Sequence, residues 1–368
     1  MRKKLTNLRL PVALLALVVV GSVLAGCSGS RIGASSWPGI TADEDTVYVA
    51  FNQSVYALNI QTGNQIWSFP SEPERTQFFY APPALTTDDQ LIVGGYDGIV
   101  YVLDANTGNL IWQFTETEGR IENGQARIIG GPVVDGDRVY VASTDGNLYA
   151  IGLTSQSLDW TFETEDTLWA SPLISENTVY LAALNQTIYA LDRETGDLLW
   201  SEQLGGAITD APVLTDGHLL VGTFGEGLQA LESANGSLLW RFETIGWVWG
   251  SPMIDEGVVY FADVTGMVYA ADLETGDEIW RLQPDGPITA SPVIDGDRIF
   301  ICTSEGVFAR QAANGNPIWQ IDVGGRALSR PLVVDDTLLI ATIESDHPIS
   351  AYNAESGARR WPTPSAVE

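Results

Sequence analysis

Short apolar runs alternate with turn residues along almost the whole chain. The stretch from Ser171 to Trp200, SPLISENTVYLAALNQTIYALDRETGDLLW, contains three such runs, and the stretches that begin at Gly131 and Ser251 follow the same pattern. The runs are rich in β-branched and aromatic residues, and Asp-Gly, Glu-Asn or Thr-Gly separates them, which is typical of strands joined by tight turns. With the short stretch around each Ser-Pro, the pattern predicts four antiparallel strands per unit.

A tryptophan closes each unit and returns in one frame, at intervals of 39 to 48 residues. The eight positions are Trp67, Trp112, Trp160, Trp200, Trp240, Trp280, Trp319 and Trp361. A sustained period of this length indicates a repeat architecture, and four-stranded units around an axis form a β-propeller with few exposed strand edges. We therefore predict an all-β fold, an eight-bladed β-propeller of four-stranded antiparallel blades over residues 37–362. The tryptophans are predicted to lie on the outermost strands and to dock neighbouring blades. The sequence leaves open whether the last blade is complete or borrows an N-terminal strand.

The nine residues that end at each tryptophan follow the phrase D-x-x-T-G-x-x-x-W. The first residue can accept backbone N–H bonds within a turn, so Asp104, Asp192 and Asp272 are interpreted as turn residues. The glycine supplies a positive φ for a hairpin that carries a bulge. Seven units have this glycine, and the third unit has Gln156 in its place.

The first 27 residues are interpreted as a processing segment. A basic start precedes an apolar stretch from Leu10 to Val23, which is short for a membrane span. The sequence Leu24-Ala25-Gly26-Cys27 resembles the lipobox of lipoprotein signal peptides, which implies cleavage before Cys27 and lipidation of its sulfur. The alternative is a plain secretory signal. Residues 28–36 are expected to form a flexible tether and residues 363–368 a C-terminal tail.

Beyond residue 27 the chain is strongly acidic, with 14 basic residues against 47 acidic ones, a net charge of −33. All 14 basic residues are arginines. Such a surface repels nucleic acids and anionic lipid headgroups, so a nucleic-acid partner is not expected. A lysine-free acidic composition resembles that of salt-adapted proteins, and compositional drift is the alternative.

Residues that could carry chemistry are sparse. Apart from Cys27, the one cysteine is Cys302, which lies in an apolar run and is predicted to be a buried strand residue, so no intrachain disulfide is expected. His218 and His347 form no cluster with metal-ligand spacing. His218 follows an Asp-Gly turn and is expected to be solvated. We therefore predict no catalytic residue, no metal and no cofactor.

The repeat resembles the tryptophan-docking, PQQ-like repeat of the quinoprotein dehydrogenases, through stretches such as VYVLDANTGNLIW and IYALDRETGDLLW, over about Trp37 to Trp361. Those enzymes hold pyrroloquinoline quinone with a vicinal disulfide and a calcium site, and this chain has no Cys-Cys pair.

The lipobox, the eight repeats and the length together resemble the BamB family of lipoproteins, which take part in outer-membrane β-barrel assembly. The resemblance implies an exported, non-catalytic and monomeric scaffold that binds protein partners. A lipid at Cys27 would attach it to the cytoplasmic membrane or to the outer membrane. A PQQ- and calcium-dependent dehydrogenase or cofactor-binding protein is the alternative.

Residues that break the repeat frame are the candidates for partner contacts. They lie in the connections between blades, of which those from Trp67 to Pro82 and from Trp112 to Pro132 are longer than the others. Aromatic and arginine side chains, the usual anchors of protein interfaces, gather there. The predicted contact residues are Phe78, Phe79, Tyr80, Arg127, Trp169, Trp247, Trp249, Arg326 and Arg330, and Arg75 and Arg120 lie in the same connections. For Trp169 and Trp249 the alternative is packing beneath neighbouring strands, and for the arginines it is neutralisation of nearby acids.

Overall fold

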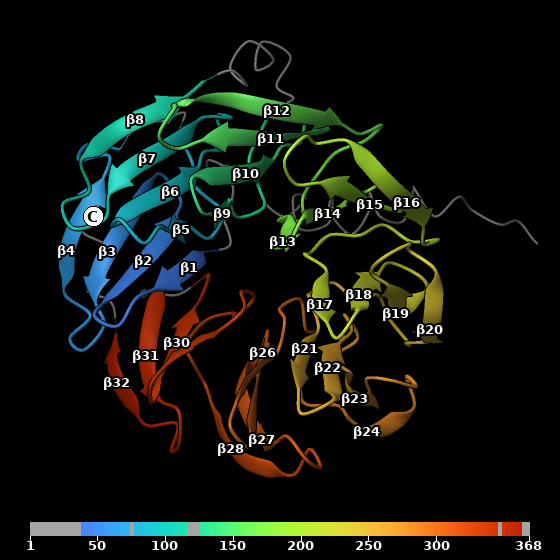
Figure 1. Cartoon of the computed structure of the whole chain (residues 1–368). Helices are drawn as coiled ribbons and strands as arrows, with labels where there is room; N and C mark the ends of the chain where they lie inside the picture. The colour runs from blue at the N-terminus through green and yellow to red at the C-terminus, as the bar shows by residue number, and fades with distance from the viewer. Residues whose placement is uncertain (1–37, 74–76, 116–125, 345–347, 363–368) are drawn as a thin grey trace, which may run out of the picture. The chain divides into compact units, whose positions relative to one another are not determined.

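Eight four-stranded antiparallel sheets, built from 32 strands, account for the regular structure of the described residues (Figure 1). The computed structural model describes residues 38–73, 77–115, 126–344 and 348–362. The described residues contain no helix, which confirms the predicted fold class. The signal segment with Cys27, the tether, the C-terminal tail, Arg75, Arg120 and His347 lie outside these ranges.

Each blade uses four strands that follow one another in the chain, from the axis outward. Blades 1 to 4 contain β1 (Gly39–Ala42), β2 (Thr46–Phe51), β3 (Ser54–Asn59) and β4 (Gln65–Phe69); β5 (Ala84–Leu85), β6 (Gln90–Gly94), β7 (Val100–Asp104) and β8 (Leu110–Phe114); β9 (Val133–Asp135), β10 (Arg138–Ala142), β11 (Asn147–Gly152) and β12 (Ser157–Glu163); and β13 (Leu173–Ser175), β14 (Thr178–Ala182), β15 (Thr187–Asp192) and β16 (Leu198–Gln203). Blades 5 to 8 contain β17 (Val213–Thr215), β18 (His218–Thr223), β19 (Gly227–Glu232) and β20 (Leu238–Phe242); β21 (Met253–Asp255), β22 (Val258–Ala262), β23 (Val268–Asp272) and β24 (Glu278–Leu282); β25 (Val293–Asp295), β26 (Arg298–Thr303), β27 (Gly306–Gln311) and β28 (Pro317–Ile321); and β29 (Leu332–Val334), β30 (Thr337–Ala341), β31 (Ile349–Asn353) and β32 (Arg359–Pro362).

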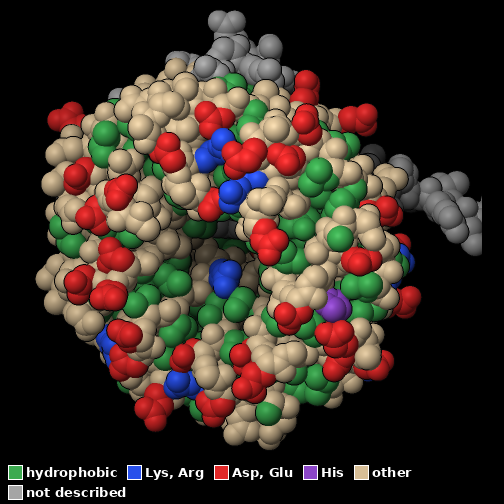
Figure 2. All heavy atoms as spheres, viewed as in Figure 1, with side chains coloured by type: hydrophobic (Ala, Val, Ile, Leu, Met, Phe, Trp, Pro, Cys, Tyr) green, Lys and Arg blue, Asp and Glu red, His purple; other side chains and the backbone are tan. Residues whose placement is uncertain are grey.

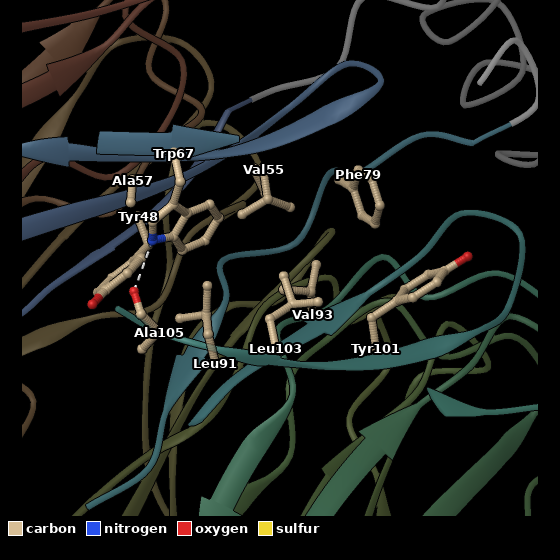
Figure 3. Close-up of a cluster of buried hydrophobic side chains, with 11 residues drawn as sticks. Tyr48, Val55, Ala57, Trp67, Phe79, Leu91, Val93, Tyr101, Leu103 and Ala105 are labelled. Carbon is tan, nitrogen blue, oxygen red and sulfur yellow. Dashed lines mark hydrogen bonds between the residues drawn. The ribbon is translucent and has the colours of Figure 1, made fainter. Parts of the chain in front are cut away.

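The two middle strands of each blade are buried on both faces because neighbouring blades cover them. In blade 4, for example, Val179 to Ala182 of β14 are all buried, whereas β16 at the outer wall is mostly exposed. The apolar side chains form clusters between adjacent blades, and Figure 3 shows the cluster shared by blades 1 and 2. The core of this propeller is therefore a ring of interblade layers rather than one central mass.

The tryptophans lie on the outermost strands and contact the following blade. The Trp67 indole Nε1 donates a 2.9 Å hydrogen bond to the carbonyl of Ala105 in blade 2 (Figure 3). The glycine of the next turn lies against the ring: a Cβ on Gly108, whose φ is +72°, would approach the Trp67 ring to 2.5 Å. Only a residue without a side chain fits here, which explains the glycine of the repeated phrase.

Blades 2 and 3 depart from this docking geometry. The outer turn of blade 3 has Gln156, at a φ of 53°, where the other units have glycine. Trp112 of blade 2 packs partly buried beside Leu153 and Leu158, and within the described part of the chain its indole makes no hydrogen bond. The junction between blades 2 and 3 is therefore built from apolar contact alone at this point.

The ring closes without strand exchange. Blade 8 is complete, because β29 to β32 are consecutive, and the Trp361 indole donates a 2.8 Å hydrogen bond to the carbonyl of Ile60 in blade 1. The same docking contact that joins neighbours in the chain thus joins the last blade to the first. This resolves the closure that the sequence left open.

The turn aspartates have the predicted role. Asp192 Oδ1 accepts bonds from the backbone N–H groups of Thr195 and Glu194, both at 2.9 Å, and these bonds lower the pKa of its carboxyl. Asp272 is held in the same way by Thr275. Cys302 is buried in β26, and burial raises the pKa of its thiol to about 12, so it is a structural residue.

No helix in the described ranges is long and apolar enough to cross a membrane.

Candidate functional site

The connections between blades emerge on one face of the ring. In blade 3, Asn147 pairs with Glu163, so the turn between β10 and β11 lies beside the end of β12. The same pairing in the other blades brings the turn between the second and third strands next to the connection to the following blade. We call this side the loop face. The turns between the first and second strands and between the third and fourth strands form the opposite, hairpin face.

A cavity of about 590 Å³ opens on the loop face across blades 2 and 3 and the connection to blade 4. We call it the Tyr96 pocket. Tyr96 comes from the turn between β6 and β7, Arg127 from the connection between blades 2 and 3, and Trp169 from the connection between blades 3 and 4. The carboxylates on its wall are those of Asp145, Glu163, Glu165 and Asp166. The pocket therefore joins aromatic rings and one cation to an acidic wall.

Arg127 and the nearby aromatic residues form a continuous chain of contacts. The Arg127 guanidinium lies 4.5 Å from the centre of the Tyr96 ring, and its Nη1 donates a 2.7 Å hydrogen bond to the Tyr96 hydroxyl. The rings of Tyr96 and Tyr80 are 4.6 Å apart, and those of Tyr80 and Phe78 are 6.5 Å apart. Burial raises the pKa of Tyr80, with a further contribution from Tyr96, so its hydroxyl is neutral at physiological pH. The structure thus brings together four of the residues expected at an interface, with Trp169 as the fourth beside Phe78, Tyr80 and Arg127.

Phe79 contradicts the expectation of an exposed contact face. Its side chain is 0% exposed and packs against Phe69 and Tyr101 between blades 1 and 2. Figure 3 shows Phe79 and Tyr101 in this cluster. The chain is extended here, since Phe79 forms a bridge with Gly95, so successive side chains point to opposite sides. Phe78 and Tyr80 face outward because Phe79 faces the core.

A second aromatic cluster lies on the loop face of blades 5 and 6. The rings of Trp247 and Phe224 stack at 5.0 Å with an angle of 11°, and the Trp249 ring lies 5.1 Å from Phe224. All three side chains are half-buried, and Ile245 in the same connection is 68% exposed. We call these three rings the Phe224 cluster. The stacking fixes the rings in place, so their exposed edges form a rigid apolar surface.

The two remaining arginines have different surroundings. Arg326 lies on the loop face of blade 8, where its backbone bridges to Ile343 and its side chain is 3.7 Å from Glu344, which supports local neutralisation of an acid. Arg330 lies immediately before β29, the innermost strand of blade 8. It is therefore beside the axis of the ring and not on the outer part of the loop face.

Asp210 occupies the axial wall in blade 5. Its carboxylate accepts hydrogen bonds from the backbone N–H groups of Ala211 (2.8 Å) and Ser251 (2.9 Å) and from the Ser291 hydroxyl (3.3 Å). Ser251 belongs to blade 6 and Ser291 to blade 7, so one side chain ties three blades together. Figure 2 shows the molecule hollowed at the centre of the ring, with acidic side chains spread over the surrounding surface.

The features that hold metal and quinone in quinoproteins were sought among the described residues and in the sequence. The described residues contain no group of three or more His, Cys, Asp or Glu side chains able to hold a metal ion, and the sequence has no adjacent cysteines. His218 is not solvated as expected: its side chain is only 12% exposed and lies 3.6 Å from Glu274 of blade 6. Glu274 is its one ion-pair partner among the described residues.

Sequence reasoning missed Tyr96, Phe224 and Asp210. Tyr96 and Phe224 lie in turns within blades, whereas the search for frame-breaking residues covered the connections between blades. Asp210 stands two residues before a proline, where other units have Ala81, Gly130, Ala170, Gly250 and Ala290. This departure from small residues was the available signal.

Comparison with known proteins yields one family and several structural neighbours. The family model described as "Outer membrane protein assembly factor BamB" matches residues 24–202, 184–290 and 264–367. BamB from Moraxella catarrhalis superposes with a TM-score of 0.69 at 19% identity, covering 85% of this chain and 92% of that one. The computationally designed Ika8 protein gives 0.74 at 16% identity (88% and 98% covered), and a europium-containing methanol dehydrogenase gives 0.68 at 15% (86% and 84%). At these identities the structural matches show the fold alone. No curated protein sequence matches the chain.

Proposed function

The chain belongs to the family of the outer membrane protein assembly factor BamB, and from this premise we propose that it is a non-catalytic scaffold that binds a protein partner on its loop face. Its specific role would be to assist the assembly of outer-membrane β-barrel proteins. A lipid on Cys27 would hold it at the membrane after export. Fold similarity extends equally to a dehydrogenase, so the proposal depends on the residues of the site and not on the fold.

The Phe224 cluster is the observation that carries this proposal. Three aromatic rings are fixed by mutual stacking and stay half-exposed, next to an isoleucine that is 68% exposed. Rigid aromatic groups lose little side-chain entropy on binding, which is why they dominate the free energy of protein interfaces. Such a surface supports association with another protein and offers no acid, base or nucleophile for catalysis.

The Tyr96 pocket is proposed as a second contact region of the same face. Tyr80, Tyr96 and Arg127 already hold one another through ring and cation contacts, so little ordering would be required when a partner binds. Two separated anchor regions on one face suit a partner that spans several blades. They do not suit a small substrate held at a single point.

Crosslinking in intact cells with identification of the attached protein tests the proposal. We expect Trp247→Ala and Trp249→Ala together to weaken partner recovery by about thirtyfold, the range of an interface hot spot. Leu199→Ser is the matched control, because Leu199 is an exposed apolar residue on the outer wall of blade 4. Equal recovery with the double variant and the wild type would refute the assignment of the Phe224 cluster.

The membrane attachment has its own test. The Cys27→Ser variant should no longer incorporate labelled palmitate and should leave the membrane fraction, while its propeller melts at an unchanged temperature. Retention of label by this variant would show that the lipid is not on Cys27.

The quinoprotein alternative is separated by ligand addition. Saturating pyrroloquinoline quinone with calcium raises the melting temperature of a protein that binds it in the folded state. Because the chain lacks the adjacent cysteines and a described metal-ligand cluster, we expect no shift. A saturable shift would replace the scaffold by a cofactor-binding function.

A further inference from the structure

Arg330 breaks the repeat at a position that faces the axis. In six of the aligned units the residue before the innermost strand's proline is small or compact: Pro82, Gly131, Ser171, Ala211, Ser251 and Ser291; the first unit has Trp37, which lies outside the described residues. Adjacent members of this set are close, since a Cβ on Gly131 would lie 3.1 Å from the Pro82 carbonyl and 3.4 Å from the Ser171 hydroxyl. The set therefore forms an inner ring, and in blade 8 a long cationic side chain replaces its small member.

The Arg330 side chain reaches past blade 7 to blade 6. Its Nη2 lies 3.1 Å from the Sδ of Met253. Met253 begins β21 of blade 6, so the contact passes over blade 7, whose strand β25 stands between β21 and β29. Arg330 is nevertheless exposed to solvent. A side chain that contacts a blade two positions away and stays exposed to solvent lies at the central hollow of the ring.

Arg330 differs from the other described arginines in its partners. Seven of the 11 described arginines form ion pairs with carboxylates. Of the rest, Arg127 and Arg310 lie over aromatic rings, and Arg359 donates to the Ser350 hydroxyl. Among the described residues, the Arg330 guanidinium contacts only a thioether, which is a weak acceptor. In a chain this acidic, a guanidinium without a carboxylate in contact has donors available for a ligand.

Asp210 affects Arg330 only at a distance. The Asp210 carboxylate already accepts three hydrogen bonds from the wall, and the described residues include no ion pair between it and Arg330. The inner strands partly desolvate the Arg330 guanidinium although the residue stays exposed, which lowers its pKa, and the negative charge of Asp210 partly opposes this. A carboxylate that enters along the axis would form a bidentate pair with the guanidinium. The two hydrogen bonds of this pair would replace the bonds to water that the guanidinium loses at this position.

We propose that Arg330 forms the centre of a carboxylate-binding site in the axial hollow, bordered by the small inner-ring residues Ser251 and Ser291 and by Met253. The ligand is either a free organic acid or the terminal carboxylate of a peptide chain. Both present the same planar anion to the guanidinium fork. The site is separate from the loop-face clusters, so the carboxylate-binding proposal is tested independently of the proposed scaffold function.

Calorimetric titration of the detergent-solubilised full chain tests this site with three probes: succinate, a tri-alanine peptide with a free carboxyl end, and its carboxyl-terminal amide. We expect Arg330→Gln to weaken carboxylate binding by about tenfold or more, the usual effect of losing a charged hydrogen-bond partner. Arg326→Gln is the matched control, an arginine of the same blade that already pairs with Glu344, and should bind as the wild type. Asp210→Asn should bind more tightly, because it removes a nearby negative charge.

The outcomes separate the sources of the carboxylate. Binding of succinate but of neither peptide assigns a free acid, and binding of the acid peptide but not its amide assigns a chain terminus. Unchanged binding by Arg330→Gln with an unchanged melting temperature overturns the proposal. So does equal weakening by Arg326→Gln, or equally tight binding of inorganic sulfate, since either would show general attraction of anions.

Discussion

The junction between blades 4 and 5 and the junction between blades 2 and 3 solve the same packing problem differently. At the first, Trp200 donates a 3.1 Å hydrogen bond to the Ser233 carbonyl and lies against Gly236. At the second, Trp112 has no indole hydrogen bond within the described residues, and Gln156 replaces the glycine. The regular junction uses a ring, a carbonyl and a glycine together, whereas the irregular one retains only apolar contact.

The irregular junction is also where the loop face is most elaborate. The Tyr96 pocket spans blades 2 and 3 and the connection to blade 4, and the connection from Trp112 to Pro132 is among the longer ones. The comparison indicates that the docking contacts of the outermost strands and the residues of the loop face can vary independently, because the ring stays closed although one docking contact is reduced. Four changes test this separation, in order of decreasing effect.

The largest effect is expected from removing the docking rings. Trp200→Ala should lower the free energy of unfolding by about 3 kcal/mol, because it removes a large packed ring and leaves the Ser233 carbonyl without its donor. Trp112→Ala should cost clearly less, about 1–2 kcal/mol, since no hydrogen bond is lost. Urea unfolding of both variants measures the difference, and equal losses would show that the two junctions are equivalent.

The glycine of the regular junction comes next. Gly236 has a φ of +77°, and a Cβ there would approach the Trp200 ring to 2.7 Å. Gly236→Ala should therefore destabilise the fold by about 2 kcal/mol, from backbone strain together with displacement of the ring. Gly217→Ala is a control for strain alone, since its φ is +81° and no atom lies within 4 Å of its Cβ position. Identical losses in the two variants would argue against contact with the ring.

A change in the opposite direction is expected at the irregular junction. Gln156 has a φ of 53°, a conformation that glycine adopts without penalty. Gln156→Gly should stabilise the protein by about 1 kcal/mol and bring blade 3 closer to the common phrase. A lower urea midpoint for this variant would mean that the Gln156 side chain makes a contribution that the docking geometry does not explain.

The smallest effect concerns acid stability of the outer turns. Asp192 has a lowered pKa because the folded turn donates backbone N–H bonds to its carboxylate. The contribution of Asp192 to the free energy of unfolding is therefore complete above the ordinary carboxyl pKa. It is lost as the pH falls through the lower pKa that the carboxyl has in the folded protein. Asp192→Asn should reduce the loss of stability between neutral and strongly acidic pH, as followed by urea midpoints. Blade 3 has Gly152 at the position that corresponds to Asp192, so the ring tolerates an outer turn without this aspartate. An unchanged pH dependence would assign the acid sensitivity to other groups.

Repeated residues made most of the fold predictable. The strand runs, the turn phrase and the tryptophan frame specify four strands per blade and eight blades, because each unit meets the same neighbours and so carries the same pattern. The candidate contact residues were predictable only as a set. Phe78 and Tyr80 face outward and Phe79 inward because a bridge to Gly95 fixes the direction of that segment, and the connection's sequence does not encode this partner.

The sequence by itself determined the repeat, the outer position of the tryptophans and the need for glycine in the outer turn, because these depend on local turn geometry and on contacts between adjacent units. Only the tertiary structure decided which frame-breaking residues meet. Phe224 joins Trp247 and Trp249, Arg127 lies on Tyr96, and Arg330 reaches past blade 7 to Met253. The physical reason is the packing of blades around one axis, which brings turns and connections of different blades together on one face and at the axis, and the repeat pattern does not specify these contacts.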